Sequence, residues 1–421
     1  MAGIRPRLHA NLEALRTLRR LQSEGRAATA EEQRVLARWS GWGAIAQQAF
    51  HHDYAAEFAA EQAELRSLLT KDEYAAAKRS TLNAHYTDAS LVQAIWQALG
   101  DLGVRGGNVL EPGCGSGNFV GFAPPQVHMT GVELDSTTAA IASLLYPDAQ
   151  IRNESFVETL APRRIFDAVV GNVPFGEHKL YDTEYNPDRS LSIHNHFLIK
   201  SLDLTKPGGV VAVITSHHTM DNQSDQVRAQ ITRQADVLGV VRLPSSAHEK
   251  AAGTKVVTDI LVLRKRSAGE AESHLASITD GVRDVAAEDA DVDVPVHVNT
   301  YFDAHPEHVL GQVGWRSGQF GPELEVTGPA QGLGERVRAA LGGIVSRAEE
   351  AGLAAVPAPA DTQPLRLAEA GRARFEGLIQ VDDEGRLTRL RRGLAEPYAP
   401  AQHRDELIAL VRLRDTIVEL M

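Results

Sequence analysis

Short apolar runs recur along the central part of this chain, and helical stretches separate most of them. The runs begin near Asn108, Met129, Ile151, Ile165, Val210, Val237 and Thr254. Strands that alternate with helices are typical of an α/β fold with a doubly wound, mostly parallel sheet. Because such sheets bind ligands at the carboxyl ends of their strands, we expect the functional residues to follow these runs.

Different patterns flank this region. Up to about residue 78 the apolar residues have helical spacing, interrupted by a turn at Ser40-Gly41-Trp42-Gly43. After residue 266 the chain is acidic and partly irregular, with expected helix fragments at 328–341 and 347–353, a linker at 356–360 and a terminal helix at 404–420. The predicted domains are a helical extension (1–79), an α/β domain (80–266) and an acidic C-terminal region (267–421). Since the chain stops within a helix, we expect that more chain, or a partner, followed it.

A glycine-rich turn follows the first apolar run. Residues 111–119 read Glu-Pro-Gly-Cys-Gly-Ser-Gly-Asn-Phe, and glycines at alternate positions let the backbone turn tightly and approach a ligand. The next run ends at Glu133 and Asp135, which are placed to accept hydrogen bonds from ribose hydroxyls, with Glu133 the better candidate. The G-x-G-x-G spacing differs from the G-x-G-x-x-G of dinucleotide sites.

A second motif, Asn172-Val173-Pro174-Phe175, ends the apolar run at 166–171. The residue types of this motif fit one particular chemistry, a reaction at the amino group of a nucleobase. This amino group is a poor nucleophile, because its lone pair is delocalised into the ring. An Asn side-chain oxygen and a neighbouring backbone carbonyl, held rigid by proline, supply acceptors for its hydrogens. Phe175 would stack on a base rotated out of the helix. We therefore predict that these four residues are catalytic; the alternative is a turn that caps a strand.

The two motifs resemble those of S-adenosylmethionine-dependent methyltransferases, in particular the amino-methylating DNA enzymes. In that family the glycine turn cradles the amino acid part of the cofactor, and the second motif is Asn or Asp, Pro, Pro, aromatic. Val173 replaces the first proline, which keeps the backbone acceptor and loses part of the loop rigidity. The resemblance implies a Rossmann-like methyltransferase sheet and S-adenosylmethionine as cofactor.

Further segments fit the same resemblance. Tyr86-Thr87 resembles the Tyr-Thr-Pro segment by which gamma-ordered adenine methyltransferases contact the methionine carboxylate, with Asp88 in place of the proline. Phe156 is placed to stack on the cofactor adenine, or else is a plain core aromatic. The cofactor-binding residues that we expect are Tyr86, Thr87, Glu111, Gly113, Gly115, Gly117, Asn118, Phe119, Glu133, Asp135 and Phe156. His194 and His196 lack a third ligand nearby, so we predict no metal.

The stretch from Gly41 to about Val326 also resembles the methyltransferase region of very large helicase-methyltransferases of phages, plasmids and integrative elements, which are related to anti-restriction proteins. No helicase ATP-binding loop of the form G-x-x-x-x-G-K-[ST] occurs here, so the expected partners are DNA and a separately encoded helicase or other subunit. The implied function is methylation of a flipped-out adenine at N6, in the setting of restriction-modification or anti-restriction. Open alternatives are cytosine N4 methylation, methylation of RNA or protein amino groups, and a non-catalytic module of a defence assembly.

Composition sets outer bounds. The net charge is −12, whereas a DNA-binding protein is expected to display a basic surface. Residues 267–421 hold 15 Lys and Arg against 26 Asp and Glu, so this region carries nearly all of the excess negative charge. The single cysteine, Cys114, excludes a disulfide framework and lies in the glycine turn, which argues against cytosine C5 chemistry. No apolar run reaches the length of a membrane span, and we predict a cytoplasmic protein without a membrane partner.

Overall fold

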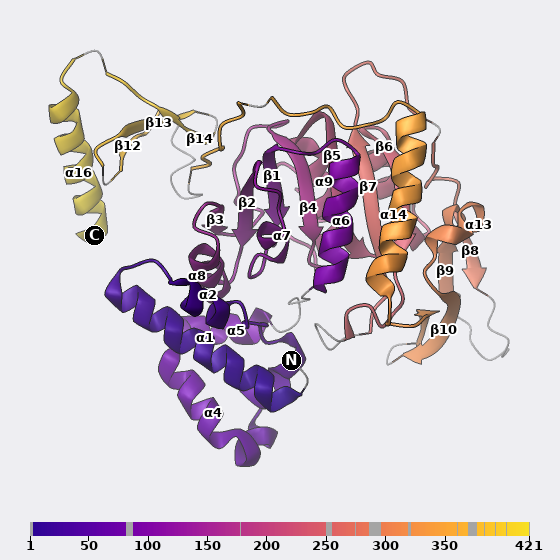
Figure 1. Ribbon diagram of the computed structural model, residues 1–421, viewed down its shortest axis with the longest axis horizontal. Coiled ribbons are helices and arrows are strands. Elements are labelled where there is room, and N and C mark those ends of the chain that lie inside the picture. The colour runs from indigo at the N-terminus through magenta and orange to yellow at the C-terminus, as the bar shows by residue number, and fades with distance from the viewer. Residues whose placement is uncertain are drawn as a thin grey trace.

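The structure is a computed structural model that describes residues 3–80, 87–176, 178–249, 255–273, 275–285, 296–318, 321–359, 361–368, 377–382, 384–391, 393–400 and 402–420. A central sheet carries helices on its faces, a helical N-terminal region lies at one end of the strands, and a small β region lies beyond the sheet edge near β3 (Figure 1). No helix among the described residues is long and apolar enough to cross a membrane.

Helices make up the described part of the N-terminal region. Its elements are α1 (Ile4–Glu24), α2 (Ala30–Leu36), η1 (Gly43–Ile45), α3 (Ala46–Phe50), η2 (His52–Tyr54), α4 (Ala55–Leu68) and α5 (Lys71–Ser80). The leucines of α1 recur every three or four residues and are buried, so one face of this helix packs into a separate hydrophobic core. Thr29 and Glu32 form a capping box that fixes the start of α2.

The described residues form a seven-stranded sheet with the order β3-β2-β1-β4-β5-β7-β6. Its strands are parallel except β7, which runs antiparallel to both β5 and β6. The strands are β1 (Gly107–Pro112), β2 (Val127–Glu133), β3 (Gln150–Asn153), β4 (Phe166–Asn172), β5 (Thr205–Ser216), β6 (Ala235–Arg242) and β7 (Thr258–Lys265). The predicted α/β fold with a mostly parallel sheet is confirmed. From the apolar run we expected the third strand to continue from Ile151 to Phe156, but it ends at Asn153 and leaves Phe156 in the following turn.

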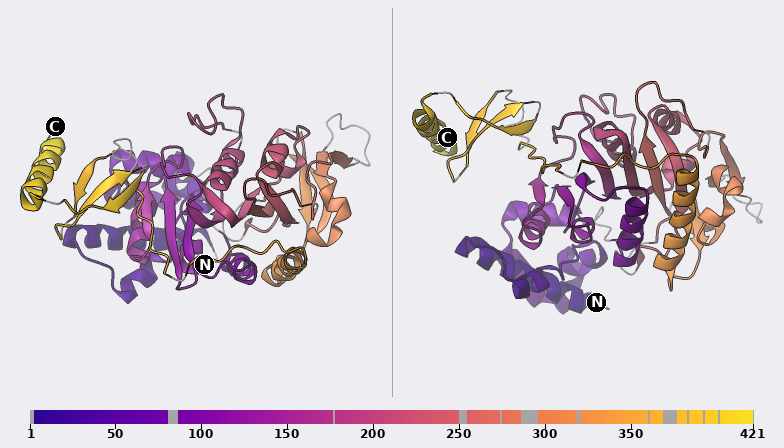
Figure 2. Two further views of the ribbon diagram at one scale, coloured as in Figure 1. Left: turned by 90° about the horizontal axis from the view of Figure 1, so that it is seen from above. Right: turned by 45° about the horizontal axis from the view of Figure 1, so that its top comes forward.

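Helices cover the sheet on both faces. Its connecting helices are α6 (Ala89–Asp101), α7 (Asn118–Gly121), α8 (Ser136–Leu145), α9 (Ile193–Leu204), α10 (His218–Asp221) and α11 (Gln226–Thr232). One face carries α6 and, beside it, α14 (Leu333–Glu350) (Figure 2). The two helix fragments expected at 328–341 and 347–353 are thus wrong: one helix continues through Gly342 and Gly343. Packing of its buried face, which includes Leu341 and Ile344, outweighs the roughly 1 kcal/mol that each internal glycine costs.

Smaller elements follow the sheet along the chain. These are β8 (Val282–Val285), β9 (Val296–Asn299), α13 (Tyr301–Ala304), η3 (Pro306–His308), β10 (Gln312–Gly318), β11 (Gly321–Thr327), β12 (Ile379–Val381), β13 (Leu387–Arg391), β14 (Leu394–Pro397) and α16 (Arg404–Leu420). The described part of the expected linker and the residues after it cross the amino ends of the strands: the Val356 N–H donates to the Gly208 carbonyl, and the Leu365 N–H donates to the Asn108 side chain. This segment is therefore bound to the sheet, and the predicted domain boundaries stay predictions.

Candidate active site

A cavity of about 460 Å³ opens at the carboxyl ends of β1, β2 and β4. It brings together most of the residues predicted from the sequence: Thr87, Glu111, Gly113, Gly115, Asn118, Phe119, Glu133, Asp135, Phe156, Asn172, Val173 and Pro174. Gly117 and Phe175 are not among its lining residues, and Tyr86 lies outside the described residues. Both predicted motifs therefore face one space, as expected for residues at neighbouring strand ends.

Three glycines of the turn have left-handed backbone conformations, and the surroundings of each are different. A Cβ at Gly113 (φ 72°) would lie 3.3 Å from Pro174 Cδ, so the glycine turn touches the second motif there. A Cβ at Gly115 (φ 55°) would meet no atom within 4 Å, because this residue faces the open cavity. A Cβ at Gly117 (φ 86°) would lie 2.6 Å from the Tyr146 ring, so this glycine serves the packing of α7.

Glu111 supports the glycine turn through hydrogen bonds to its backbone. Its side chain is buried and accepts hydrogen bonds from the backbone N–H groups of Phe119 and Val120. Burial raises the pKa of Glu111 well above its usual value. One oxygen, Oε2, has no hydrogen-bond partner among the described residues. Glu111 thus fixes the shape of the turn, and its contact with a cofactor stays a prediction.

The acidic pair at the end of β2 is held by backbone groups. Glu133 accepts hydrogen bonds from the Gly115 N–H (2.9 Å) and the Asp135 N–H (2.8 Å), one on each carboxylate oxygen. Burial raises the pKa of Glu133 to about 7. Asp135 caps α8 by accepting a hydrogen bond from the Thr138 N–H at 2.8 Å. The Glu133 carboxylate therefore links the glycine turn to the strand that faces it.

Phe156 lines the cavity from the turn that follows β3. It is 3% exposed and packs against Phe197 of α9 with ring centroids 4.8 Å apart. Its backbone carbonyl accepts a hydrogen bond from Lys200 Nζ at 2.7 Å. Phe156 is therefore a core residue that also lines the cavity, and its stacking on the cofactor adenine stays a prediction.

The second motif begins on the last residue of β4. The Val173 N–H donates to the Ile214 carbonyl of β5 at 3.0 Å, and the Val173 side chain is fully buried. This hydrogen bond ties the loop to the sheet at the position where the resembling enzymes have proline. Phe175 is half-buried beside His248, with ring centroids 6.4 Å apart.

The helical N-terminal region supplies cavity residues that the sequence did not predict: Gly41, Trp42, Ala76 and Arg79. Trp42 packs edge-on against Trp39, whose indole N–H donates to Thr138 of α8 at 3.3 Å. Arg79 is the one lysine or arginine among the described cavity-lining residues. The Ser40-Gly41-Trp42-Gly43 turn was the available signal, but nothing in its local pattern indicates which cavity it faces.

The two histidines considered as metal ligands point to different partners. The His194 ring lies 2.9 Å from the Ser192 hydroxyl, and the His196 ring lies 2.9 Å from the Asp182 carboxylate. Burial lowers the pKa of His194 to about 3, so this ring is neutral at physiological pH. Neither residue is among the described residues that line the cavity.

The chain is similar to known proteins over part of its length. The chain is 33% identical over 200 residues to Defense against restriction protein B of Escherichia phage P1; the match covers 46% of this chain and 9% of that protein's length. The type I restriction-modification system methyltransferase subunit from Streptococcus thermophilus superposes with a TM-score of 0.38 at 18% identity, over 52% of this chain and 55% of that one. A family model described as N-6 DNA Methylase matches residues 68–280, half of the chain. The chain therefore belongs to the N-6 DNA Methylase family of methyltransferases.

Proposed function

We propose that this chain transfers a methyl group from S-adenosylmethionine to the N6 amino group of a flipped-out adenine in DNA. One observation carries the proposal: a single cavity joins the glycine turn, Glu133 and Phe156 to Asn172 and Pro174. A methyl donor and an acceptor base must meet in one space for direct transfer, and the cavity has the two sets of residues on adjoining walls.

The cofactor half of the cavity fits the donor's chemistry. Glu133, ionised above about pH 7, would accept hydrogen bonds from the ribose hydroxyls, and Phe156 would stack on the adenine. Gly115 leaves room for the methionine part, while Arg79 offers the positive charge that its carboxylate requires. The bound cofactor would supply an electrophilic methyl group on its sulfonium.

The catalytic half would hold the target amino group. In the proposed mechanism Asn172 Oδ1 and the Val173 carbonyl accept its two hydrogens and orient the nitrogen lone pair toward the methyl group. These dipoles also favour the positive charge that develops on the nitrogen during transfer. Phe175, which lies next to the cavity wall, would stack on the extruded base.

The proposed setting is an anti-restriction or restriction-modification assembly. The match to a phage protein named for defence against restriction supports it, and the chain spans only 9% of that protein's length. Strand separation, DNA recognition or both would then come from other segments or subunits, including a helicase. Near-neutral charge over residues 1–266 fits a chain that relies on partners for part of its DNA affinity.

The test is transfer of labelled methyl from S-adenosylmethionine to unmethylated genomic DNA, with the nucleosides resolved by mass. Asn172→Ala should abolish the signal, while Asn222→Ala, in an exposed turn outside the cavity, should leave it intact. N6-methyladenine would support the proposal, and N4-methylcytosine would keep the mechanism and change the base. Label in RNA or protein instead of DNA would overturn the DNA assignment. Absence of cofactor binding would overturn the enzyme assignment in favour of a non-catalytic module.

A further inference from the structure

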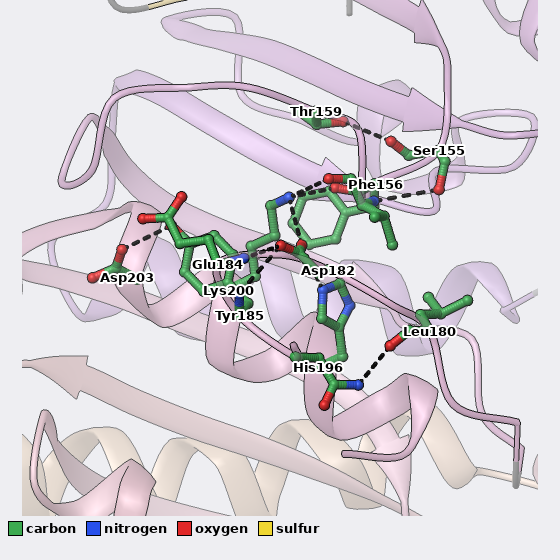
Figure 3. A network of polar contacts seen from close by, with 12 residues as sticks. Ser155, Phe156, Thr159, Leu180, Asp182, Glu184, Tyr185, His196, Lys200 and Asp203 are labelled. Carbon is green, nitrogen blue, oxygen red and sulfur yellow. Dashed lines mark hydrogen bonds and ion pairs between the residues drawn. The ribbon is translucent and has the colours of Figure 1, made fainter. Parts of the chain in front are cut away.

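A buried lysine reaches the wall of the cavity from α9. Lys200 is 2% exposed, and its Nζ donates to the carbonyls of Phe156 (2.7 Å) and Val157 (3.0 Å) and to Asp182 Oδ2 (3.2 Å) (Figure 3). An ammonium has three N–H donors, and all three therefore have acceptors here. The Nζ atom also lies 5.1 Å from the centre of the Phe156 ring.

Asp182, which accepts the hydrogen bond from Lys200, lies in the loop at 178–191 that follows the second motif. Its Oδ2 also lies 2.9 Å from His196 Nε2, while its Oδ1 accepts hydrogen bonds from the Glu184 and Tyr185 N–H groups. Asn186 closes the same loop: its side chain donates to the carbonyls of residues 180 and 191 and accepts the N–H of residue 191. The loop is thus a compact unit with a buried carboxylate that faces α9 (Figure 3).

The charges of this cluster are balanced. Burial opposes ionisation of Asp182, but the hydrogen bonds from His196 and the Glu184 N–H, together with the charge of Lys200, outweigh it and lower the pKa of Asp182 below its ordinary value. Burial lowers the pKa of His196, so the ring is neutral and donates from Nε2. One ammonium and one carboxylate therefore share the buried site, and the ammonium has two bonds left for the backbone at 156–157.

Lys200 consequently joins two cavity walls. Residues 154–156 line the cavity on one side of the cluster, and His178 and Leu180, from the start of the loop, line it on the other. The second wall continues directly from Asn172–Phe175, which holds the target base in the proposed function. No other described lysine or arginine bonds both segments through one side chain.

We propose that Lys200 is a positioning residue, which holds Phe156 in place for the cofactor and holds the loop at 178–191 in place for the target base. The inference rests on the proposed function for the identity of both ligands. Because one ammonium serves both walls, order in either wall favours order in the other. Binding of the cofactor should therefore strengthen binding of DNA, and the coupling should depend on Lys200.

The experiment compares Lys200→Met with Lys265→Met in the full chain. Lys265, at the end of β7, is also buried, at 5% exposed, but its Nζ donates to Gln234, which does not line the cavity. This variant therefore controls for loss of a buried lysine. A double variant, Lys200→Met with Asp182→Asn, removes the buried charge left behind and separates stability from positioning. The readouts are thermal unfolding, calorimetric binding of S-adenosylhomocysteine, DNA affinity with and without that ligand, and hydrogen exchange of the backbone at 155–157 and 184–191.

Lys200→Met should raise the dissociation constant of S-adenosylhomocysteine roughly tenfold or more, which is about 1.4 kcal/mol, and should speed exchange in both segments. The double variant should regain thermal stability without regaining affinity, and the ligand should no longer strengthen DNA binding. If the double variant regains affinity for S-adenosylhomocysteine together with thermal stability, Lys200 has only a structural role and the proposal is overturned. Hydrogen exchange in Lys200→Met that is unchanged from the wild type in either segment would overturn it as well. A wild-type chain that binds no S-adenosylhomocysteine would overturn the proposed function instead, and the exchange data would still decide whether Lys200 holds both segments.

Discussion

Replacement of single glycines in the turn should separate ligand binding from stability. Gly115 has φ 55° and open space where a Cβ would lie, so Gly115→Ala costs only the left-handed conformation, about 1–2 kcal/mol. Its new methyl group, however, projects into the cavity where the methionine part of the cofactor is expected. Gly117→Ala has the same conformational cost and adds a Cβ at 2.6 Å from the Tyr146 ring, an overpacking cost of about 1–3 kcal/mol.

Thermal unfolding with and without S-adenosylhomocysteine measures both effects. At a ligand concentration of about 100 times the dissociation constant, the wild-type chain should gain about 2.7 kcal/mol. Gly115→Ala should unfold slightly below the wild type and lose most of this ligand-dependent gain. Gly117→Ala should be the less stable of the two and keep a larger share of the gain. A Gly115→Ala chain that gains as much as the wild type would refute the placement of the ligand against this turn.

Three further predictions concern ionisation, burial and the second motif. Burial raises the pKa of Glu133 to about 7, so affinity for S-adenosylhomocysteine, measured by calorimetry, should rise from pH 6 to 8 as the carboxylate forms. The thermal stability of the unliganded chain should instead fall as pH rises toward 7, because the folded chain loses the proton that the unfolded chain has already lost. Glu133→Gln should flatten both profiles. Arg242 is fully buried between two aspartates, so Arg242→Met should lower the free energy of unfolding in urea by about 3–5 kcal/mol. Arg386→Met, which removes an exposed ion pair, should leave this free energy nearly unchanged. Val173→Pro removes the N–H that bonds Ile214 and should lower the unfolding temperature and the methyl-transfer rate; a gain in either would contradict the structural account of this position.

Much of the fold and of the site could be predicted because the information is local. Each strand of the sheet coincides with an apolar run, and the two motifs directly follow β1 and β4, so the rule that ligands bind at carboxyl ends places them together. The position and direction of β7 could not be predicted, since an antiparallel strand between β5 and β6 has the same apolar pattern as a parallel strand at the edge. The same holds for Trp42 and Lys200, whose positions depend on packing between segments that lie far apart in the chain.

The valine in the second motif illustrates where local inference stops. From the sequence, exchange of proline for valine at position 173 implies a looser loop, because the ring that fixes φ is absent. In the structure the same exchange provides an N–H, and this N–H donates to the carbonyl of Ile214 on the neighbouring strand at 3.0 Å. A proline at this position would leave that carbonyl without its partner, and the fully buried Val173 side chain adds packing against the sheet. The loop is thus tied to the sheet by a strand hydrogen bond and a buried side chain, without the ring that the family pattern places at this position.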